Sequence, residues 1–263
     1  MHMADALLTP AVAGVMYAAS AVVAGASIVE LHKEEKQDLT STGKKLPTMA
    51  VMSALVFAGQ MINYTIPGTG SSGHLCGGLL LTSVLGPWAG FLSMIVILTI
   101  QSLFFADGGL MALGANVWNM AFYGCFVGYF LIYRPLMRSR CFARRGERAA
   151  NRLKITLASV LGCVLTLQLG AFSVVLETTL SGITDLPFGA FCAIMQPIHL
   201  AIGLIEGLIT AAVLLFLYEA RPELLRDVCT GGETAGKVSF KGTIAVIALA
   251  AVLVGGGLSL LAS

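Results

Sequence analysis

Residues 187–218 read PFGAFCAIMQPIHLAIGLIEGLITAAVLLFLY and contain a single charged residue, Glu206. This stretch is longer than the roughly 20 apolar residues that cross a bilayer as a helix. Further apolar stretches lie at 10–29, 47–64, 74–86, 87–106, 110–133, 153–180 and 240–261. The pattern predicts an all-α integral membrane protein that folds as a polytopic helix bundle.

The composition of the whole chain supports this prediction. Of its 263 residues, 57% are hydrophobic and only 11% are charged, and the mean hydropathy is +0.86. Soluble domains carry about 25% charged residues. A water-soluble fold would lack the polar side chains to cover itself, so we expect the lipid bilayer to surround the protein. The net charge of +2 gives no reason to expect nucleic-acid binding.

The positions of the basic residues predict the topology. All sixteen Lys and Arg residues fall in three segments between apolar stretches: Lys33, Lys36, Lys44 and Lys45; Arg134, Arg138, Arg140, Arg144, Arg145, Arg148, Arg152 and Lys154; Arg221, Arg226, Lys237 and Lys241. The positive-inside rule makes these loops cytoplasmic. Counting crossings from them predicts eight segments, with both ends of the chain on the non-cytoplasmic side. The segment 74–86 is short for a span, so it either crosses with help from its neighbours or is re-entrant.

The non-cytoplasmic side is acidic. Its segments contain Asp5, Asp107, Glu177 and Asp185 and no basic residue. An acidic face raises the local concentration of cations. The alternative is that the positive-inside rule alone keeps Lys and Arg away from this side.

The first two residues, Met1 and His2, can chelate a metal ion. The α-amine, the amide nitrogen of residue 2 and Nδ1 of His2 close a five-membered and a six-membered ring in one plane. Planar nitrogen ligation suits Ni²⁺ or Cu²⁺, and imidazole also suits Co²⁺ and Zn²⁺. The alternative is a His at position 2 without a role. We expect Met1 to remain the N-terminus, because residues 1–10 lack the basic start of a signal peptide.

A second histidine, His74, lies in the segment TIPGTGSSGHLCGG, residues 65–78. Our topology puts it on the same side of the membrane as His2, where it can fill the fourth position of the planar chelate. The glycines of this segment allow the backbone to bend into a cavity. The alternative is a flexible loop with a solvated histidine. Four more polar residues on this side are candidates to orient the ligands: Asp5, Asn63, Asp107 and Asn116.

Other patterns leave more than one interpretation open. His199 and Glu206 share one face of a predicted helix; they either bond neighbouring helices or form a functional pair in a membrane enzyme or a passive cation channel. Ala50, Ala54 and Ala58 form a stripe of small residues that either packs internally or docks a partner helix. The chain has no P-loop, HExxH or GxSxG motif, so energy for transport must come from a partner or an ion gradient.

Several blocks of the sequence resemble one family. They are MHMAD at 1–5, PGT at 67–69 with HLCGGLL at 74–80, LGPWA at 85–89, QSLF at 101–104 with DGGLMALGAN at 107–116, and His199 followed by GLIEGLIT at 203–210. Together they resemble the CbiM/NikM family, the substrate-binding S components of energy-coupling-factor (ECF) nickel and cobalt transporters. The likeness covers about residues 1–220.

The resemblance implies a seven-helix S-component core in the cell membrane, with Ni²⁺ or Co²⁺ bound as substrate by Met1, His2 and His74. It implies docking of the stripe Ala50, Ala54 and Ala58 on a transmembrane T subunit, with two cytoplasmic ATPase subunits supplying energy. The protein is then a transport subunit and not an enzyme, with no catalytic cofactor. Planar nitrogen ligation favours nickel, while family members for both metals share the motif.

We therefore expect a metal-binding transmembrane domain at 1–220, a cytoplasmic linker at 221–239 and an additional transmembrane helix at 240–263. The last segment goes beyond the seven-helix core. Some family members carry a small accessory membrane subunit, either fused or separate, and this helix is a candidate remnant of one.

Overall fold

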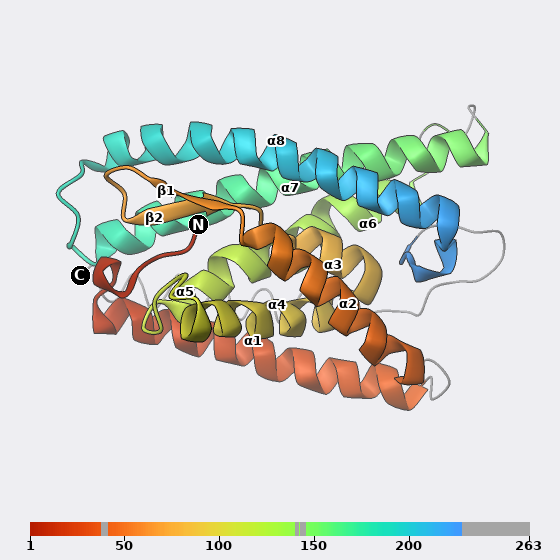
Figure 1. Ribbon diagram of the computed structural model, residues 1–263, viewed down its shortest axis with the longest axis horizontal. Coiled ribbons are helices and arrows are strands. Elements are labelled where there is room, and N and C mark those ends of the chain that lie inside the picture. The colour runs from red at the N-terminus through yellow and green to blue at the C-terminus, as the bar shows by residue number, and fades with distance from the viewer. Residues whose placement is uncertain (38–41, 140–141, 143–145, 228–263) are drawn as a thin grey trace.

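The computed structural model describes residues 1–37, 42–139, 142 and 146–227. Its long helices run along the long axis of the molecule (Figure 1). They are α1 (Pro10–Gln37), α2 (Thr42–Gln60), α4 (Pro87–Phe104), α7 (Glu147–Leu180), α8 (Phe188–Ala220) and one continuous helix made of α5 (Leu113–Val117), η2 (Trp118–Tyr133) and α6 (Arg134–Arg138). Within this last helix η2 is a π-helix, with the wider turns of i→i+5 hydrogen bonding.

The prediction of an all-α membrane bundle is confirmed. In the part of the chain that the structure describes, five helices are long and apolar enough to cross a membrane: Pro10–Lys36, Pro87–Phe104, Leu113–Arg138, Glu147–Leu180 and Phe188–Ala220. The apolar part of α2, Leu46–Gln60, is shorter. Many large apolar side chains on the outer faces of the helices are exposed, such as Leu208 and Phe216 of α8. Such a surface is stable against lipid and costly in water.

The short segment 74–86 is not a helical span. An antiparallel hairpin of β1 (Asn63–Ile66) and β2 (Ser71–His74) comes first, with Asn63 opposite His74. The eight-residue helix α3 (Gly78–Leu85) follows, and is only about 12 Å long at 1.5 Å per residue. A tight turn at Gly86 then leads into α4, where Gly86 has a φ of 89° and Pro87 begins the helix.

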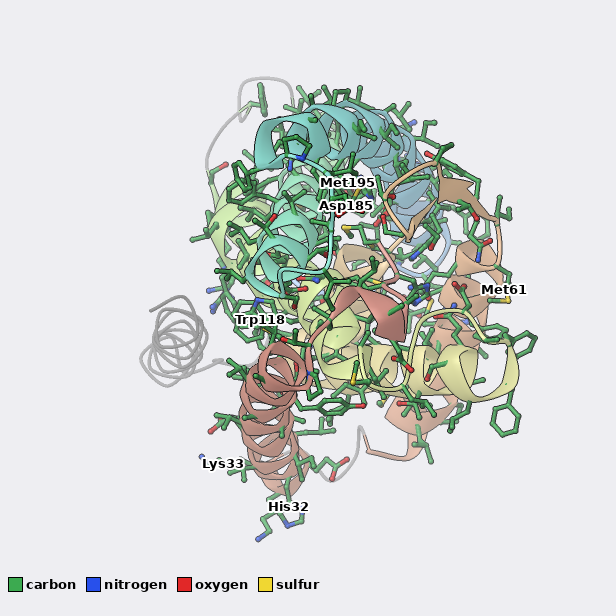
Figure 2. The ribbon with its side chains drawn as sticks, turned by 90° about the vertical axis from the view of Figure 1, so that its left-hand side faces the viewer. His32, Lys33, Met61, Trp118, Asp185 and Met195 are labelled. Atoms are coloured by element: carbon green, nitrogen blue, oxygen red, sulfur yellow. The ribbon has the colours of Figure 1, made fainter. Side chains whose placement is uncertain are left out.

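The basic segments are more helical than the apolar pattern suggested. Helix α1 continues to Gln37 and therefore carries Lys33 and Lys36. Helix α7 begins at Glu147 and carries Arg148 and Arg152. These helix ends lie at the right-hand end of the bundle in Figure 1, away from the N-terminal residues. Figure 2 views the molecule from the N-terminal end and shows His32 and Lys33 projecting away from the bundle.

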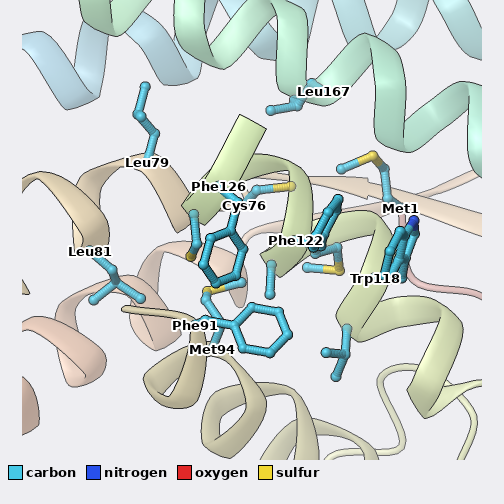
Figure 3. Packing of buried hydrophobic residues seen from close by; sticks show 14 of the residues in the cluster. Met1, Cys76, Leu79, Leu81, Phe91, Met94, Trp118, Phe122, Phe126 and Leu167 are labelled. Carbon is cyan, nitrogen blue, oxygen red and sulfur yellow. The ribbon is translucent and has the colours of Figure 1, made fainter. Parts of the chain in front are cut away.

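Small residues allow the closest helix pair to form. A Cβ atom added at Gly203 or Gly207 of α8 would lie only 2.9 Å or 2.6 Å from the Cα atoms of Val164 and Val160 in α7. This agrees with the close approach that the GxxxG spacing predicts. In η2, Gly124 packs in the same way against the backbone of Gly78 in α3. The helices thereby enclose one buried cluster, part of which Figure 3 shows.

Residues 221–227, the start of the predicted linker, pack on the bundle. The short helix η4 (Pro222–Leu224) follows α8, and Leu225 is buried. Arg226 N donates to Ser83 O at 3.0 Å. Asp227 Oδ1 accepts from Arg138 Nε at 2.7 Å. The remainder of the predicted linker and the predicted helix at 240–263 lie outside the described residues.

Candidate metal-binding site

The N-terminal residues enter the bundle in an extended conformation. Met3 forms an antiparallel bridge with Ser71 of β2. Ser72 N donates to His2 O at 3.2 Å, and the Met1 amine donates to Ser72 O. Residues 1–3 therefore lie along the β hairpin as an additional strand, and the N-terminus lies inside the molecule beside β2 (Figure 1).

Polar contacts hold this strand from its other side. Gly109 N donates to Met3 O at 2.9 Å. The Asn116 side chain pairs with the Met3 backbone, accepting from Met3 N at 2.8 Å and donating to Met3 O at 3.2 Å. Asp5 Oδ1 accepts from Ala112 N at 2.9 Å. Two of the residues selected from sequence, Asp5 and Asn116, thus contact the strand or the turn beside it, and their role towards a metal stays a prediction.

The three residues predicted to bind metal are buried together. Met1, His2 and His74 are exposed by only 1%, 4% and 2% of their surfaces. The imidazole rings of His2 and His74 lie with their centroids 4.5 Å apart and their planes inclined by 31°. The Met1 side chain belongs to the same buried cluster as Cys76 and Trp118 (Figure 3).

The hydrogen bonding of His74 leaves one ring nitrogen free. Its Nδ1 lies 2.7 Å from Leu75 O, so Nδ1 carries the proton. Its Nε2 is buried and has no hydrogen-bond partner among the described residues. A histidine that donates one ring N–H to a carbonyl and presents the other nitrogen unpaired has the usual arrangement of a metal ligand.

The His2 ring faces Asp107, which was also selected from sequence. His2 Nδ1 lies 3.0 Å from Asp107 Oδ1. The other carboxylate oxygen of Asp107 accepts from Asn63 Nδ2 at 2.8 Å. Nδ1 is the nitrogen that a chelate with the amine and the amide needs. An ion held by Nδ1 therefore lies next to the Asp107 carboxylate, or the carboxylate turns aside as the ion enters.

Burial keeps the nitrogen ligands uncharged. Burial lowers the pKa of the Met1 amine from 8.0 to about 6, against the attraction of Cys76, Asp107 and Glu206. Burial also lowers the pKa of His2, although Asp107 opposes the shift. The pKa of His74 is well below its usual value because of burial, the nearby amine, His2 and, more weakly, His199. At neutral pH these groups are thus mostly neutral, and few excess protons compete with a metal ion. The Nδ1 proton of His2, which faces Asp107, has to move to Nε2 before Nδ1 can bind an ion.

A pocket of about 400 Å³ opens beside His2 and Asp107. It is lined by backbone and small polar side chains together with His2, Asp5, Ser71, Ser72, Ser102 and Asp107. The pKa of Asp107 is lowered; burial alone would raise it, but the His2 ring and the Asn63 amide outweigh burial. The pocket therefore offers a cation a negatively charged route towards His2.

Side chains alone do not form a metal cluster in the part of the chain that the structure describes. Across residues 1–37, 42–139, 142 and 146–227, no three His, Cys, Asp or Glu side chains are arranged to hold an ion. The predicted donor set therefore needs the amine of Met1 and the amide of His2 in addition to the two imidazoles, and it stays a prediction. Four nitrogen donors suit a borderline divalent transition metal ion such as Ni²⁺ or Co²⁺.

The remaining residues selected from sequence have clear locations. Ala50, Ala54 and Ala58 are all on the exposed side of α2. His199 and Glu206 are buried on α8, and both Glu206 oxygens accept backbone N–H groups, from Cys76 and Gly77. The sequence patterns did not single out Ser72, which acts through its backbone and therefore has no side-chain signal.

Comparison with known proteins gives consistent results. Residues 2–224 match the family model CbiM, described as the cobalt uptake substrate-specific transmembrane region. The chain is 39% identical over 237 residues to a protein of Archaeoglobus fulgidus named as a fused nickel transport protein, NikMN, covering 89% of this chain and 71% of that protein. It is 33% identical over 181 residues to cobalt transport protein CbiM of Sorangium cellulosum, covering 68% and 76%.

A crystal structure described as a truncated transition metal transporter has the same fold. It superposes with a TM-score of 0.70 at 31% sequence identity, and the match covers 84% of this chain and 99% of the other.

Proposed function

Because this chain belongs to the CbiM family, and is thus a multi-pass membrane protein of nickel and cobalt transport, we propose that it is the substrate-capture subunit of an ECF-type importer. The ion is bound by four nitrogens: the Met1 amine, the amide and Nδ1 of His2, and Nε2 of His74. The substrate is Ni²⁺ or Co²⁺, and the planar donor set favours Ni²⁺.

One observation carries this proposal. A buried amine whose pKa is lowered to about 6 donates to β2, next to two neutral imidazoles whose ring centroids lie 4.5 Å apart. The Nε2 atoms of His2 and His74 are buried without a hydrogen-bond partner among the described residues, which destabilises the fold unless a ligand pairs with them. The proposal requires the mature protein to keep Met1 with a free α-amine, which mass spectrometry of the purified protein checks.

The distribution of charge supports an orientation in the cell membrane. The described Lys and Arg residues gather at the end of the bundle opposite the N-terminal strand (Figure 1). By the positive-inside rule, this distribution supports a metal site at the non-cytoplasmic face. The exposed stripe Ala50, Ala54 and Ala58 on α2 is the surface for a transmembrane T subunit. Two ATPase subunits supply the energy from the cytoplasm, and the predicted helix at 240–263 serves in place of a small accessory subunit.

Titration calorimetry of the purified protein in detergent tests the proposal. We expect one Ni²⁺ or Co²⁺ per chain, with a heat that depends on the ionisation enthalpy of the buffer. That dependence follows because the His2 amide loses its proton on binding. No saturable binding, or binding without proton release, contradicts the chelate.

The pH dependence of affinity is a second expected result. Protons and the metal compete for the same lone pairs, so affinity falls as pH falls. Between pH 8 and 6 the amide alone releases a proton, which predicts about a tenfold loss per pH unit. Below the amine pKa of about 6, a second proton is displaced and the loss steepens to about a hundredfold per unit. Calorimetry at several pH values measures the slope; a constant slope across pH 6 contradicts the role of the amine.

Asp107 gives a kinetic prediction. Replacing Asp107 with Asn removes the negative charge of the pocket but keeps the size of the side chain. We expect Ni²⁺ association to slow by about tenfold at low ionic strength, with a smaller effect at high salt. Stopped-flow measurement of binding checks this. Asp185→Asn is the control, because Asp185 is exposed at the same end of the molecule but does not line the pocket.

A membrane enzyme or a passive channel that uses His199 and Glu206 has less support. The Glu206 carboxylate is engaged by two backbone N–H groups and is therefore poorly placed to exchange protons with a substrate. Metal flux into liposomes by this chain alone, without ATP, would favour the channel.

A further inference from the structure

We propose that Glu206, from the middle of α8, is a positioning residue that acts on the metal through one peptide group and the His74 ring. The inference rests on the function proposed above. Glu206 is 130 positions away from Cys76 in the sequence. We infer that it nevertheless influences the orientation and basicity of His74, the proposed metal ligand.

The connection from Glu206 to His74 begins with two hydrogen bonds to the Glu206 carboxylate. Glu206 is only 3% exposed. Its Oε2 accepts from Cys76 N at 2.6 Å, and its Oε1 accepts from Gly77 N at 2.9 Å. The carboxylate thus binds two consecutive N–H groups just before helix α3, where Gly77 has a φ of 74°. Hydrogen bonds to a carboxylate are about twice as strong as those between neutral groups.

One peptide group then connects Glu206 to His74. The N–H of Cys76 and the C=O of Leu75 belong to the same planar peptide, and in a trans peptide they point in opposite directions. Glu206 accepts from the N–H, and Leu75 O accepts from His74 Nδ1 at 2.7 Å. A single chain of hydrogen bonds therefore runs from the carboxylate through the peptide to the imidazole.

This chain has a chemical consequence for Nε2. Hydrogen bonds in series polarise one another. A carboxylate that accepts from the peptide N–H increases the negative charge on Leu75 O and strengthens the bond from His74 Nδ1. Carboxylate–histidine–metal arrangements raise the basicity of the ligand nitrogen and fix the ring orientation. Here a peptide group stands between the carboxylate and the histidine, and His74 Nε2 is the atom left for the metal.

A second contact keeps the loop from moving. Gln60, the last residue of α2, is fully buried and its Nε2 donates to Cys76 O at 2.5 Å. Val56 of the same helix packs against Gly77, where an added Cβ would lie 2.5 Å from the Val56 side chain. The Leu75–Cys76 and Cys76–Gly77 peptide groups are thus both held by α8, and the second is also held by α2. Any shift of either helix changes the position of the ring.

A double-mutant cycle separates this role from simple stabilisation of the fold. Glu206→Gln keeps the size of the side chain, but its amide can accept from only one of the two N–H groups. We expect Ni²⁺ affinity to fall by about tenfold or more. The His74→Ala protein keeps the three donors of Met1 and His2, so binding stays measurable. In that background the same change is expected to have almost no effect. Affinities come from calorimetry of all four proteins.

Each outcome of the cycle either supports or contradicts the proposal. If Glu206→Gln lowers Ni²⁺ affinity equally in both backgrounds, or does not lower it in the wild type, Glu206 does not act through His74. If His74→Ala alone leaves affinity unchanged, the proposed metal site itself is wrong. If His74→Ala weakens binding and Glu206→Gln does not, only the proposed role of Glu206 fails. If Glu206→Gln does not accumulate as folded protein, Glu206→Asp replaces it in the same cycle. This substitution keeps the charge but shortens the side chain.

Spectroscopy and a matched control complete the test. A change in the donor strength of His74 shifts the visible absorption bands of bound Ni²⁺, so we expect a shift in Glu206→Gln. Glu219→Gln makes the same substitution at the C-terminal end of α8, where Glu219 pairs with Arg148. It is expected to leave both the spectrum and the affinity unchanged. An unshifted spectrum in Glu206→Gln contradicts the polarising role.

Discussion

One extra residue placed before Met1 is expected to lower Ni²⁺ affinity by roughly 10⁴-fold or more. Structural Zn²⁺ sites gain about 10–16 kcal/mol from four ligands, or roughly 3 kcal/mol for each, which corresponds to about a hundredfold in affinity. The extension converts the Met1 amine into an amide and moves His2 to the third position. The five-membered ring loses the free amine that closes it. The ring within His2 stays covalently intact, but displacement of residues 1–3 moves it away from His74, so at least two donors are lost together.

The packing of Met1 makes the extension still less tolerable. Met1 is 1% exposed, and its sulfur lies against Gly170 of α7, where an added Cβ would approach it to 2.7 Å. The amine donates to Ser72 O. An added residue has to displace these contacts and draws the strand of residues 1–3 away from β2.

Calorimetry on an extended protein and on the same protein cleaved back to Met1 is the direct comparison. Recovery of affinity after cleavage shows that the free amine is responsible. Full affinity in the extended protein would remove the basis of the proposed function.

Replacing His74 with Ala is expected to lower Ni²⁺ affinity by roughly a hundredfold, the share of one ligand. The loss is smaller than for the extension, because the chelate of Met1 and His2 stays intact. The fourth planar position then passes to water, so the visible spectrum of bound Ni²⁺ changes as well. Oxygen is a weaker donor to Ni²⁺ than imidazole.

His32→Ala is the matched control for this variant. His32 lies on α1 near the end of the bundle that is opposite the site, and it projects away from the helices (Figure 2). Its loss is expected to leave affinity and spectrum unchanged. Equal effects of the two histidine substitutions would show that the measured binding is adventitious.

The membrane helices could be predicted from sequence because the cost of placing each residue in lipid depends mainly on its own side chain. The apolar stretches at 87–106 and 187–218 correspond closely to α4 and α8. The structure of the stretch at 74–86 could not be predicted in the same way. A strand followed by a short helix buries its apolar residues just as a membrane span does, so the apolar pattern does not distinguish the two. Helices α1 and α7 extend past the apolar pattern to Gln37 and Glu147, because helical hydrogen bonding continues into water.

The candidate site was predictable in part. Asp107 and Asn116 were selected only because they share one side of the membrane with His2. Their contacts, to the His2 ring and to the Met3 backbone, depend on how the turn after α4 folds against the N-terminal strand. The Glu206 contact to Cys76 had no signal in the sequence beyond a charge at membrane depth, which either bonds a neighbouring helix or has a function.

The sequence by itself determined that the chain is a membrane helix bundle and that Met1 and His2 can chelate an ion. Both follow from local chemistry: the solvation of side chains in a continuous stretch, and ring sizes set by covalent bonds between adjacent residues. Only the tertiary structure decided that the imidazole of His74 lies beside that chelate and that a carboxylate on α8 holds the peptide behind it. Such contacts join residues far apart in the chain, and they exist only because the helices pack closely enough to bring them within hydrogen-bonding distance.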